Sequence, residues 1–114
     1  MPTKIYNEIN NFVIKAKKLL GDRLKKIILY GSYARGDYNT NSDIDIMLLT
    51  DLSDDEIVKY RQILWDYVAD IEIDYGIILN PLLKNVNDFN ELVDVTPFYQ
   101  NVINEGVVIG EEKR

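Results

Sequence analysis

Residues 27–49 read IILYGSYARGDYNTNSDIDIMLL, and they hold two apolar segments joined by a short polar one. The first segment is short, contains β-branched residues and runs into Gly31, which is typical of a buried strand that ends in a tight turn. A strand that stops at Gly31-Ser32 and continues as a helix points free backbone N–H groups and a hydroxyl at one place. Such groups favour an anion, and phosphate is the usual one.

The second apolar segment, residues 44–49, predicts a strand that begins next to two aspartates. Side chains alternate between the two faces of a strand, so Asp43 and Asp45 are expected to project to the same side. Their Cα atoms should lie roughly 6.5–7 Å apart, which lets both carboxylates reach one divalent cation. Hard oxygen ligands suit Mg²⁺ or Mn²⁺, with the remaining ligands coming from water and substrate phosphates.

Each half of this pattern also has a simpler explanation. Gly-Ser after a strand is usually an ordinary turn, and Asp-x-Asp at the start of a strand is usually a solvated strand end. The ordered combination is more informative, because GSYARGDYNTNSDID (residues 31–45) resembles the signature of the minimal nucleotidyltransferases of the DNA polymerase β superfamily. That signature is Gly-Ser-x-Ala-Arg-Gly followed by Ser-Asp-x-Asp, and the resemblance extends to the stretch at residues 96–106.

The resemblance implies a polymerase β-like nucleotidyltransferase fold and an enzyme that uses ATP with Mg²⁺ or Mn²⁺. Such proteins often act as antitoxins to HEPN-domain toxins, and some transfer AMP from ATP to a tyrosine of the toxin. By this resemblance Asp43 and Asp45 hold the metal, and the Gly31 backbone and Ser32 hydroxyl bind the phosphates. Arg35 either stabilises charge on the triphosphate, since its planar fork suits phosphate, or has a packing or surface role.

Two other functions stay open. The chain is alternatively a non-catalytic antitoxin or nucleotide-binding module that neutralises its partner by binding alone. Transfer to a small molecule such as an antibiotic is the third possibility, although the chain lacks the extra domain with which larger relatives hold such acceptors.

The position of a third carboxylate is ambiguous in this sequence. The family often supplies one, usually as the general base, from the strand beside the Asp-x-Asp pair. If that strand begins at Glu72, Asp74 is the candidate catalytic residue and metal ligand. If it begins after Gly76, the matching position falls near Asn80, which cannot accept a proton at neutral pH. We take Asp74 as the candidate and keep Asn80 as the alternative, in which transfer would be slower or lost.

Composition narrows the classes of function. The 114 residues, 46% of them hydrophobic, fit a single nucleotidyltransferase domain over residues 1–114. Cysteine and histidine are absent, which excludes disulfides, thiolate sites and a histidine base and leaves carboxylates as metal ligands. A net charge of −6 argues against general nucleic-acid binding. Without a signal peptide or a long apolar run, a cytoplasmic protein with no membrane contact is expected; a homo-oligomer stays open.

Hydrophobic periodicity predicts helices and strands in alternating order. The expected fold class is α/β (α+β), with a mixed sheet of three or four strands and helices packed mainly on one face. Besides the two strands above, a helix is expected over residues 4–20, closed by Gly21, and a second helix from a Ser53–Glu56 capping box to about residue 71. A strand is expected over residues 77–83, with Pro81 at an edge or bulge. A helix from Thr96-Pro97 to Gly106 and a strand over residues 107–109 complete the fold.

Overall fold

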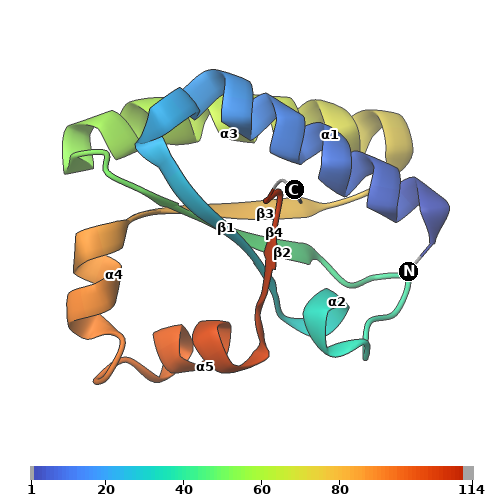
Figure 1. Ribbon diagram of the computed structural model, residues 1–114. Coiled ribbons are helices and arrows are strands. Elements are labelled where there is room, and N and C mark those ends of the chain that lie inside the picture. The colour runs from blue at the N-terminus through green and yellow to red at the C-terminus, as the bar shows by residue number, and fades with distance from the viewer. Residues whose placement is uncertain (1, 112–114) are drawn as a thin grey trace.

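The computed structural model describes residues 2–111, which form a four-stranded mixed sheet with helices on both faces (Figure 1). The order of the strands in the sheet is β3-β2-β1-β4. The elements are α1 (Thr3–Leu20), the short 3₁₀ helix η1 (Gly21–Arg23), β1 (Leu24–Tyr30), α2 (Ser32–Arg35), β2 (Ile44–Thr50), α3 (Asp54–Tyr75), β3 (Leu79–Asn85), α4 (Val86–Leu92), α5 (Pro97–Glu105) and β4 (Val107–Ile109).

The sheet is mixed because its neighbouring strands are connected in different ways. β1 pairs antiparallel with both β2 and β4, whereas β2 pairs parallel with β3. A parallel neighbour requires a crossover connection, and the long helix α3 provides it. β3 lies at an edge of the sheet, so Pro81, which has no N–H to donate, sits where the sequence predicts it.

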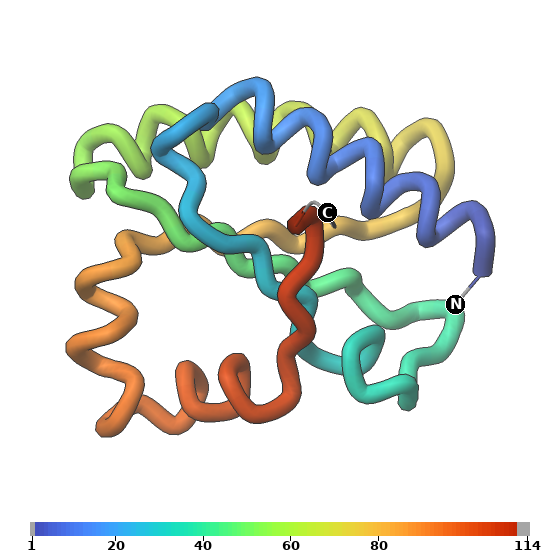
Figure 2. The backbone as a smooth tube through the Cα atoms, in the orientation of Figure 1, coloured from blue at the N-terminus to red at the C-terminus, as the bar shows by residue number. Residues whose placement is uncertain are grey.

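The two faces of the sheet carry separate hydrophobic clusters. The long helices α1 and α3 cover one face, as expected, and the shorter α4 and α5 lie on the other (Figures 1 and 2). Successive residues of β2 point to opposite faces: Ile46 and Leu48 pack in the first cluster, and Met47 packs in the second with Phe89 and Val102. Asp45 shares the face of Met47 and therefore points to the side of α4 and α5.

Most of the predicted elements are confirmed, including the end of α1 at Gly21 and the capping box of Ser53 and Glu56 at the start of α3. β1 begins at Leu24, three residues earlier than its apolar segment, and the other differences lie after residue 71. α3 continues to Tyr75 because no helix-breaking residue occurs before Gly76, whose φ of 67° ends the helix. β3 consequently begins at Leu79 and not at residue 77.

Helix α4 is the element that the sequence analysis missed. Its start is encoded by Asn85, whose side chain accepts hydrogen bonds from the backbone N–H groups of Asn87 and Asp88. The helix is only seven residues long, too short to show a clear apolar period. Within residues 2–111, no helix combines the length and apolar character needed to cross a membrane.

Candidate active site

The turn after β1 brings the first part of the sequence motif against the second. Gly31 has a φ of 76°, in the region that favours glycine, and α2 begins at the next residue. A Cβ atom at this position would collide with Oδ2 of Asp45. Glycine is thus required at position 31 both by the backbone conformation and by the carboxylate above it.

The polar loop before β2 is folded by its own hydrogen bonds. The backbone N–H of Asn39 donates to Oγ of Ser42 (2.9 Å), and the N–H of Ser42 donates to the carbonyl oxygen of Asn39 (3.1 Å). The Asn39 side chain in turn accepts from the N–H of Asn41 (2.8 Å). This turn leads directly into Asp43, which is exposed one residue before β2 begins.

Asp45 is the aspartate that the sheet holds most closely. It lies half-buried on β2, paired with Tyr30 of β1 on one side and with Asn80 of β3 on the other. Nδ2 of Asn80 donates a hydrogen bond of 3.0 Å to Oδ1 of Asp45. The position beside the Asp-x-Asp pair is therefore an amide.

The structure corrects the placement of the third carboxylate. Asp74 was expected on a strand beginning at Glu72, but both residues belong to α3, so the strand beside Asp45 carries Asn80 at the matching position. In the part of the chain that the structure describes, no group of three or more acidic residues is arranged to hold a metal ion. The alternative that the sequence left open, with Asn80 in this place, is the one that the fold adopts.

A pocket of about 330 Å³ brings several of the predicted site residues together. Gly31, Ser32, Arg35 and Asp45 line it, whereas Asp43 and Asp74 are not part of its lining. The opposite wall is formed by α5, which contributes Phe98, Asn101, Val102 and Glu105, and Tyr30 of β1 also lines the pocket. Sequence analysis did not identify this wall, although a spacing of three to four residues is what one face of a helix requires.

Arg35 connects the motif to this helical wall. Its Nη1 donates to Oε2 of Glu105 (3.0 Å) and its Nε donates to Oδ2 of Asp37 (3.1 Å). These two carboxylates raise the pKa of Arg35, with Asp37 the larger contributor. All three side chains are well exposed, so each ion pair contributes little to stability. Arg35 is thus placed at the rim of the pocket, with carboxylate partners that a phosphate group would have to displace.

Tyr30 forms the buried end of the pocket. Its burial, and secondly the negative charge of Asp45, raise the pKa of Tyr30 to about 12. Its ring packs edge-on against Phe98, with the ring centres 5.7 Å apart. Tyr30 therefore keeps its proton at neutral pH and gives this part of the pocket an aromatic floor with no charge of its own.

The donor set fits a Mg²⁺ or Mn²⁺ ion that is shared with a substrate. Mg²⁺ is usually held by one or two carboxylates together with waters and substrate phosphates. Asp43 and Asp45 supply two carboxylates that are two residues apart in the sequence, and Oδ2 of Asp45 lies beside Gly31, where the Gly-Ser-Tyr-Ala-Arg-Gly motif begins.

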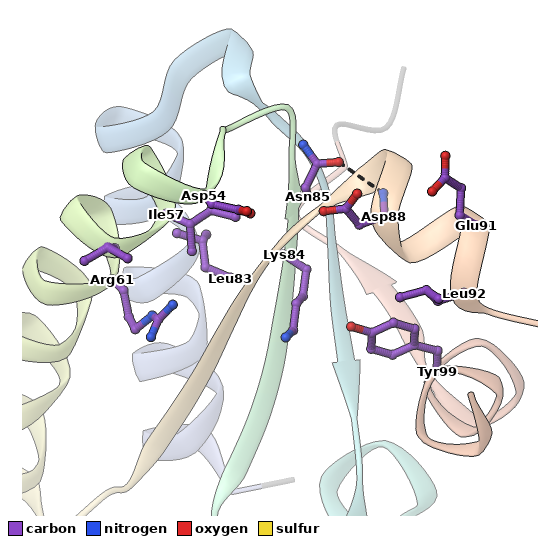
Figure 3. A pocket seen from close by; sticks show the side chains of 11 residues that line it. Asp54, Ile57, Arg61, Leu83, Lys84, Asn85, Asp88, Glu91, Leu92 and Tyr99 are labelled. Carbon is purple, nitrogen blue, oxygen red and sulfur yellow. Dashed lines mark hydrogen bonds between the residues drawn. The ribbon is translucent and has the colours of Figure 1, made fainter. Parts of the chain in front are cut away.

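A larger pocket, of about 410 Å³, lies between α3, β3 and α4 and does not contain the sequence motif (Figure 3). Its polar lining is of mixed charge: Arg61 and Lys84 are basic, and Asp54, Asp88 and Glu91 are acidic. Asn85, which borders it, is occupied in capping α4. This pocket is the larger of the two, but no residue of the motif at residues 31–45 lines it.

Comparison with known proteins agrees with the motif. The family model described as "Nucleotidyltransferase domain" matches residues 9–102. The chain is 37% identical over 101 residues to "Putative protein adenylyltransferase MJ0604" of Methanocaldococcus jannaschii, which covers 89% of this chain and 93% of that protein. It is 32% identical over 104 residues to MJ1305, a protein of the same organism with the same functional name, over 90% of this chain and 70% of the relative.

Two solved structures share the fold at lower identity. One is a toxin–antitoxin crystal structure with AMP-PNP: the match has a TM-score of 0.57 at 23% identity and covers 90% of this chain and 73% of that one. The other is a mutant of the toxin–antitoxin pair MntA–HpeT, matched with a TM-score of 0.54 at 22% identity over 91% and 73% of the two chains. At this identity the likeness establishes the fold.

Proposed function

Because the chain belongs to the nucleotidyltransferase family, we propose that it transfers AMP from ATP to a hydroxyl group of a partner protein and so acts as an antitoxin. The observation that carries the proposal is the pocket in which Gly31, Ser32 and Asp45 meet. Relatives named as protein adenylyltransferases support the choice of AMP and of a protein acceptor. The toxin–antitoxin titles of the fold neighbours support the antitoxin role.

In this mechanism the chain binds the triphosphate by its backbone and by small polar groups. The Gly31 backbone and the Ser32 hydroxyl hold the β and γ phosphates, because the N–H groups of Ala34 and Arg35 already donate to the carbonyl oxygen of Gly31, at 3.1 and 3.0 Å. Asp43 and Asp45 would hold Mg²⁺ or Mn²⁺. When bound, the ion offsets negative charge on the phosphates during transfer. Asp45 is oriented for this role before any ligand arrives, by Asn80 and Gly31.

The reaction balances as a single displacement at phosphorus. The acceptor hydroxyl oxygen forms a bond to the α-phosphorus of ATP, the bond from that phosphorus to the oxygen bridging to the β-phosphorus breaks, and pyrophosphate leaves. The hydroxyl proton passes to solvent, because the position beside Asp45 holds an amide that cannot accept it. Catalysis then depends on positioning and charge stabilisation, which dominate such transfers in general.

We further propose that the acceptor is a tyrosine of a HEPN-type toxin. Support comes from the motif at residues 31–45 and from the pocket itself, which opens between α2 and α5. Phe98, on the α5 wall, is 44% exposed, so an aromatic acceptor side chain entering there would meet an aromatic surface.

A non-catalytic antitoxin is the second candidate, and Asn80 is the observation that favours it. Without a third carboxylate the site lacks the usual base, so binding of the partner alone would then provide protection. The two functions differ in their dependence on the metal-binding aspartates. Protection of cells from the toxin by an Asp45→Asn variant would favour neutralisation by binding, whereas loss of protection would favour transfer.

Transfer is tested with α-³²P-labelled ATP and Mg²⁺, added to a lysate of the source organism with the native chain or a variant. We expect a labelled protein band with the native chain and none with Asp45→Asn, which removes a metal ligand while keeping the side chain's shape. Asp70→Asn, the same change at an exposed position of α3, is the matched control and should label normally. Equal labelling by Asp45→Asn would contradict the proposed site.

A further inference from the structure

Asn80 is the polar side chain that the sheet places directly beside Asp45. The parallel register of β2 and β3 sets the two residues opposite each other, and Nδ2 of Asn80 donates to Oδ1 of Asp45 at 3.0 Å. An ionised carboxylate only accepts hydrogen bonds, so the amide must present its NH₂ group to it. The contact therefore fixes the orientation of both groups.

The other oxygen of the same carboxylate is confined from the opposite side. Oδ2 of Asp45 lies so close to the Cα atom of Gly31 that a Cβ at position 31 would collide with it. One oxygen is thus bound to β3, and the other faces the turn at which the nucleotide-binding motif begins. The hydrogen bond to Oδ1 and the turn that lies next to Oδ2 together restrict rotation of the carboxylate about its terminal bond.

We propose that Asn80 is a positioning residue for the metal-binding carboxylate: it holds Oδ1 of Asp45 so that Oδ2 is presented to the cation and the phosphates above Gly31. The inference rests on the proposed function, because it takes Asp45 as a metal ligand. It goes further in assigning a role to the residue that replaces the expected third carboxylate. At position 80 the chain therefore has a hydrogen-bond donor in the place where a carboxylate would have supplied a base.

The chemistry of the two side chains explains why an amide suits this position. A carboxylate at position 80 would offer no donor and would place a second negative charge against Asp45. The neutral amide keeps Asp45 in one orientation before a cation is present. Groups of this kind, which orient a ligand without touching the metal, typically change metal affinity about 10- to 100-fold when they are removed.

The test measures Mn²⁺ affinity by electron paramagnetic resonance, a readout that does not depend on turnover. We expect Asn80→Ala to bind Mn²⁺ about 10- to 100-fold more weakly than the native chain. Asn90→Ala removes an equally exposed amide, from α4, and should bind Mn²⁺ like the native chain. Asn80 is exposed, so its truncation should leave the thermal midpoint nearly unchanged.

The outcomes separate this inference from the proposed function. Equal Mn²⁺ affinity in the native chain and Asn80→Ala would overturn the role of Asn80 and leave the metal site standing. Failure of the native chain itself to bind Mn²⁺, with or without ATP, would overturn both. Should Asn80→Ala fail to fold, Asn80→Ser, a smaller change, carries the same expectation of weakened binding.

Discussion

At the scale of single residues, the geometry of the site requires a glycine at position 31. Gly31 combines a positive φ with a neighbour, the Asp45 carboxylate, that leaves no room for a side chain. Gly36 also has a positive φ, 86°, but nothing lies within 4 Å of the position that its Cβ would take. Their backbones also differ: Gly36 is in the left-handed α region, with a ψ of 5°, whereas Gly31, with a ψ of −156°, lies in a region that is essentially restricted to glycine.

We expect Gly31→Ala to lower the free energy of unfolding by more than the roughly 1–2 kcal/mol that a left-handed conformation alone costs a non-glycine residue. Gly36→Ala should lose only about that amount. Urea unfolding followed by circular dichroism measures both values. Only Gly31→Ala should also weaken Mn²⁺-dependent ATP binding, because it alone moves Asp45. Equal losses in the two variants would show that neither the close contact nor the glycine-specific backbone of Gly31 adds to the cost.

Asp74 provides a second test at this scale. The helix α3 carries it, so Asp74→Asn should retain native labelling of the acceptor by α-³²P-labelled ATP. The matched variant is Asp43→Asn, with the same loss of charge at the aspartate of the motif, and it should abolish labelling. Loss of labelling in Asp74→Asn would mean that the carboxylate reaches the site from the end of α3.

At the scale of elements, one arginine ties the start of α3 to the start of β1, at the end of the sheet where Leu24 pairs with Thr50. Arg23, at the end of η1, forms a two-pronged contact with Glu56, at 2.9 and 3.0 Å, and also contacts Asp51. Glu56 is at the same time the capping-box residue for Ser53. The hydrogen bonds from Arg23, and then those from Ser53, lower the pKa of Glu56 from 4.5 to about 2.

This pKa predicts an acid dependence of stability. A carboxyl group whose pKa is lower in the folded state stabilises the fold above its unfolded pKa, and loses that contribution as pH falls through its folded pKa. For Glu56 the loss runs from about pH 4.5 to about pH 2. We expect the thermal midpoint of Glu56→Gln to fall less steeply in this range than that of the native chain. Glu72→Gln, on the same helix, is the control and should follow the native curve.

At the scale of the whole molecule, the two hydrophobic clusters share one sheet. α1 and α3 pack on one face and α4 and α5 on the other, while β1 and β2 contribute alternate residues to both clusters. The candidate pocket lies on the side of α5. The hydrophobic cluster that contains Phe89 and Val102 therefore supports the α5 wall, which faces the motif at residues 31–45. We propose residues 1–114 as one cooperative domain for this reason.

Cooperativity is tested by a truncation in the smaller cluster. Phe89 is 2% exposed, and Phe89→Ala should cost about 3–5 kcal/mol of unfolding free energy, as buried phenylalanines generally do. Because the strands are shared, the loss should shift a single transition seen alike by far-ultraviolet and near-ultraviolet circular dichroism. Two separate transitions would contradict the single domain.

The sequence by itself determined the elements and the chemistry that are local in the chain. The alternation of side chains along β2, the capping box at Ser53 and the glycine turn at residue 31 each depend on neighbours a few residues away, so spacing reveals them. The signature at residues 31–45 indicated the nucleotidyltransferase family, to which the match over residues 9–102 assigns the chain. Helix α4 was missed because seven residues give too short a period.

Only the tertiary structure decided which groups stand beside these residues. Asp74 and Asn80 are six positions apart, and the choice between them depended on where α3 ends and in which register β3 pairs with β2. The wall of α5 opposite Asp45 likewise depends on packing between segments more than 50 residues apart. Such contacts follow from the free energy of the whole fold, which no local pattern contains.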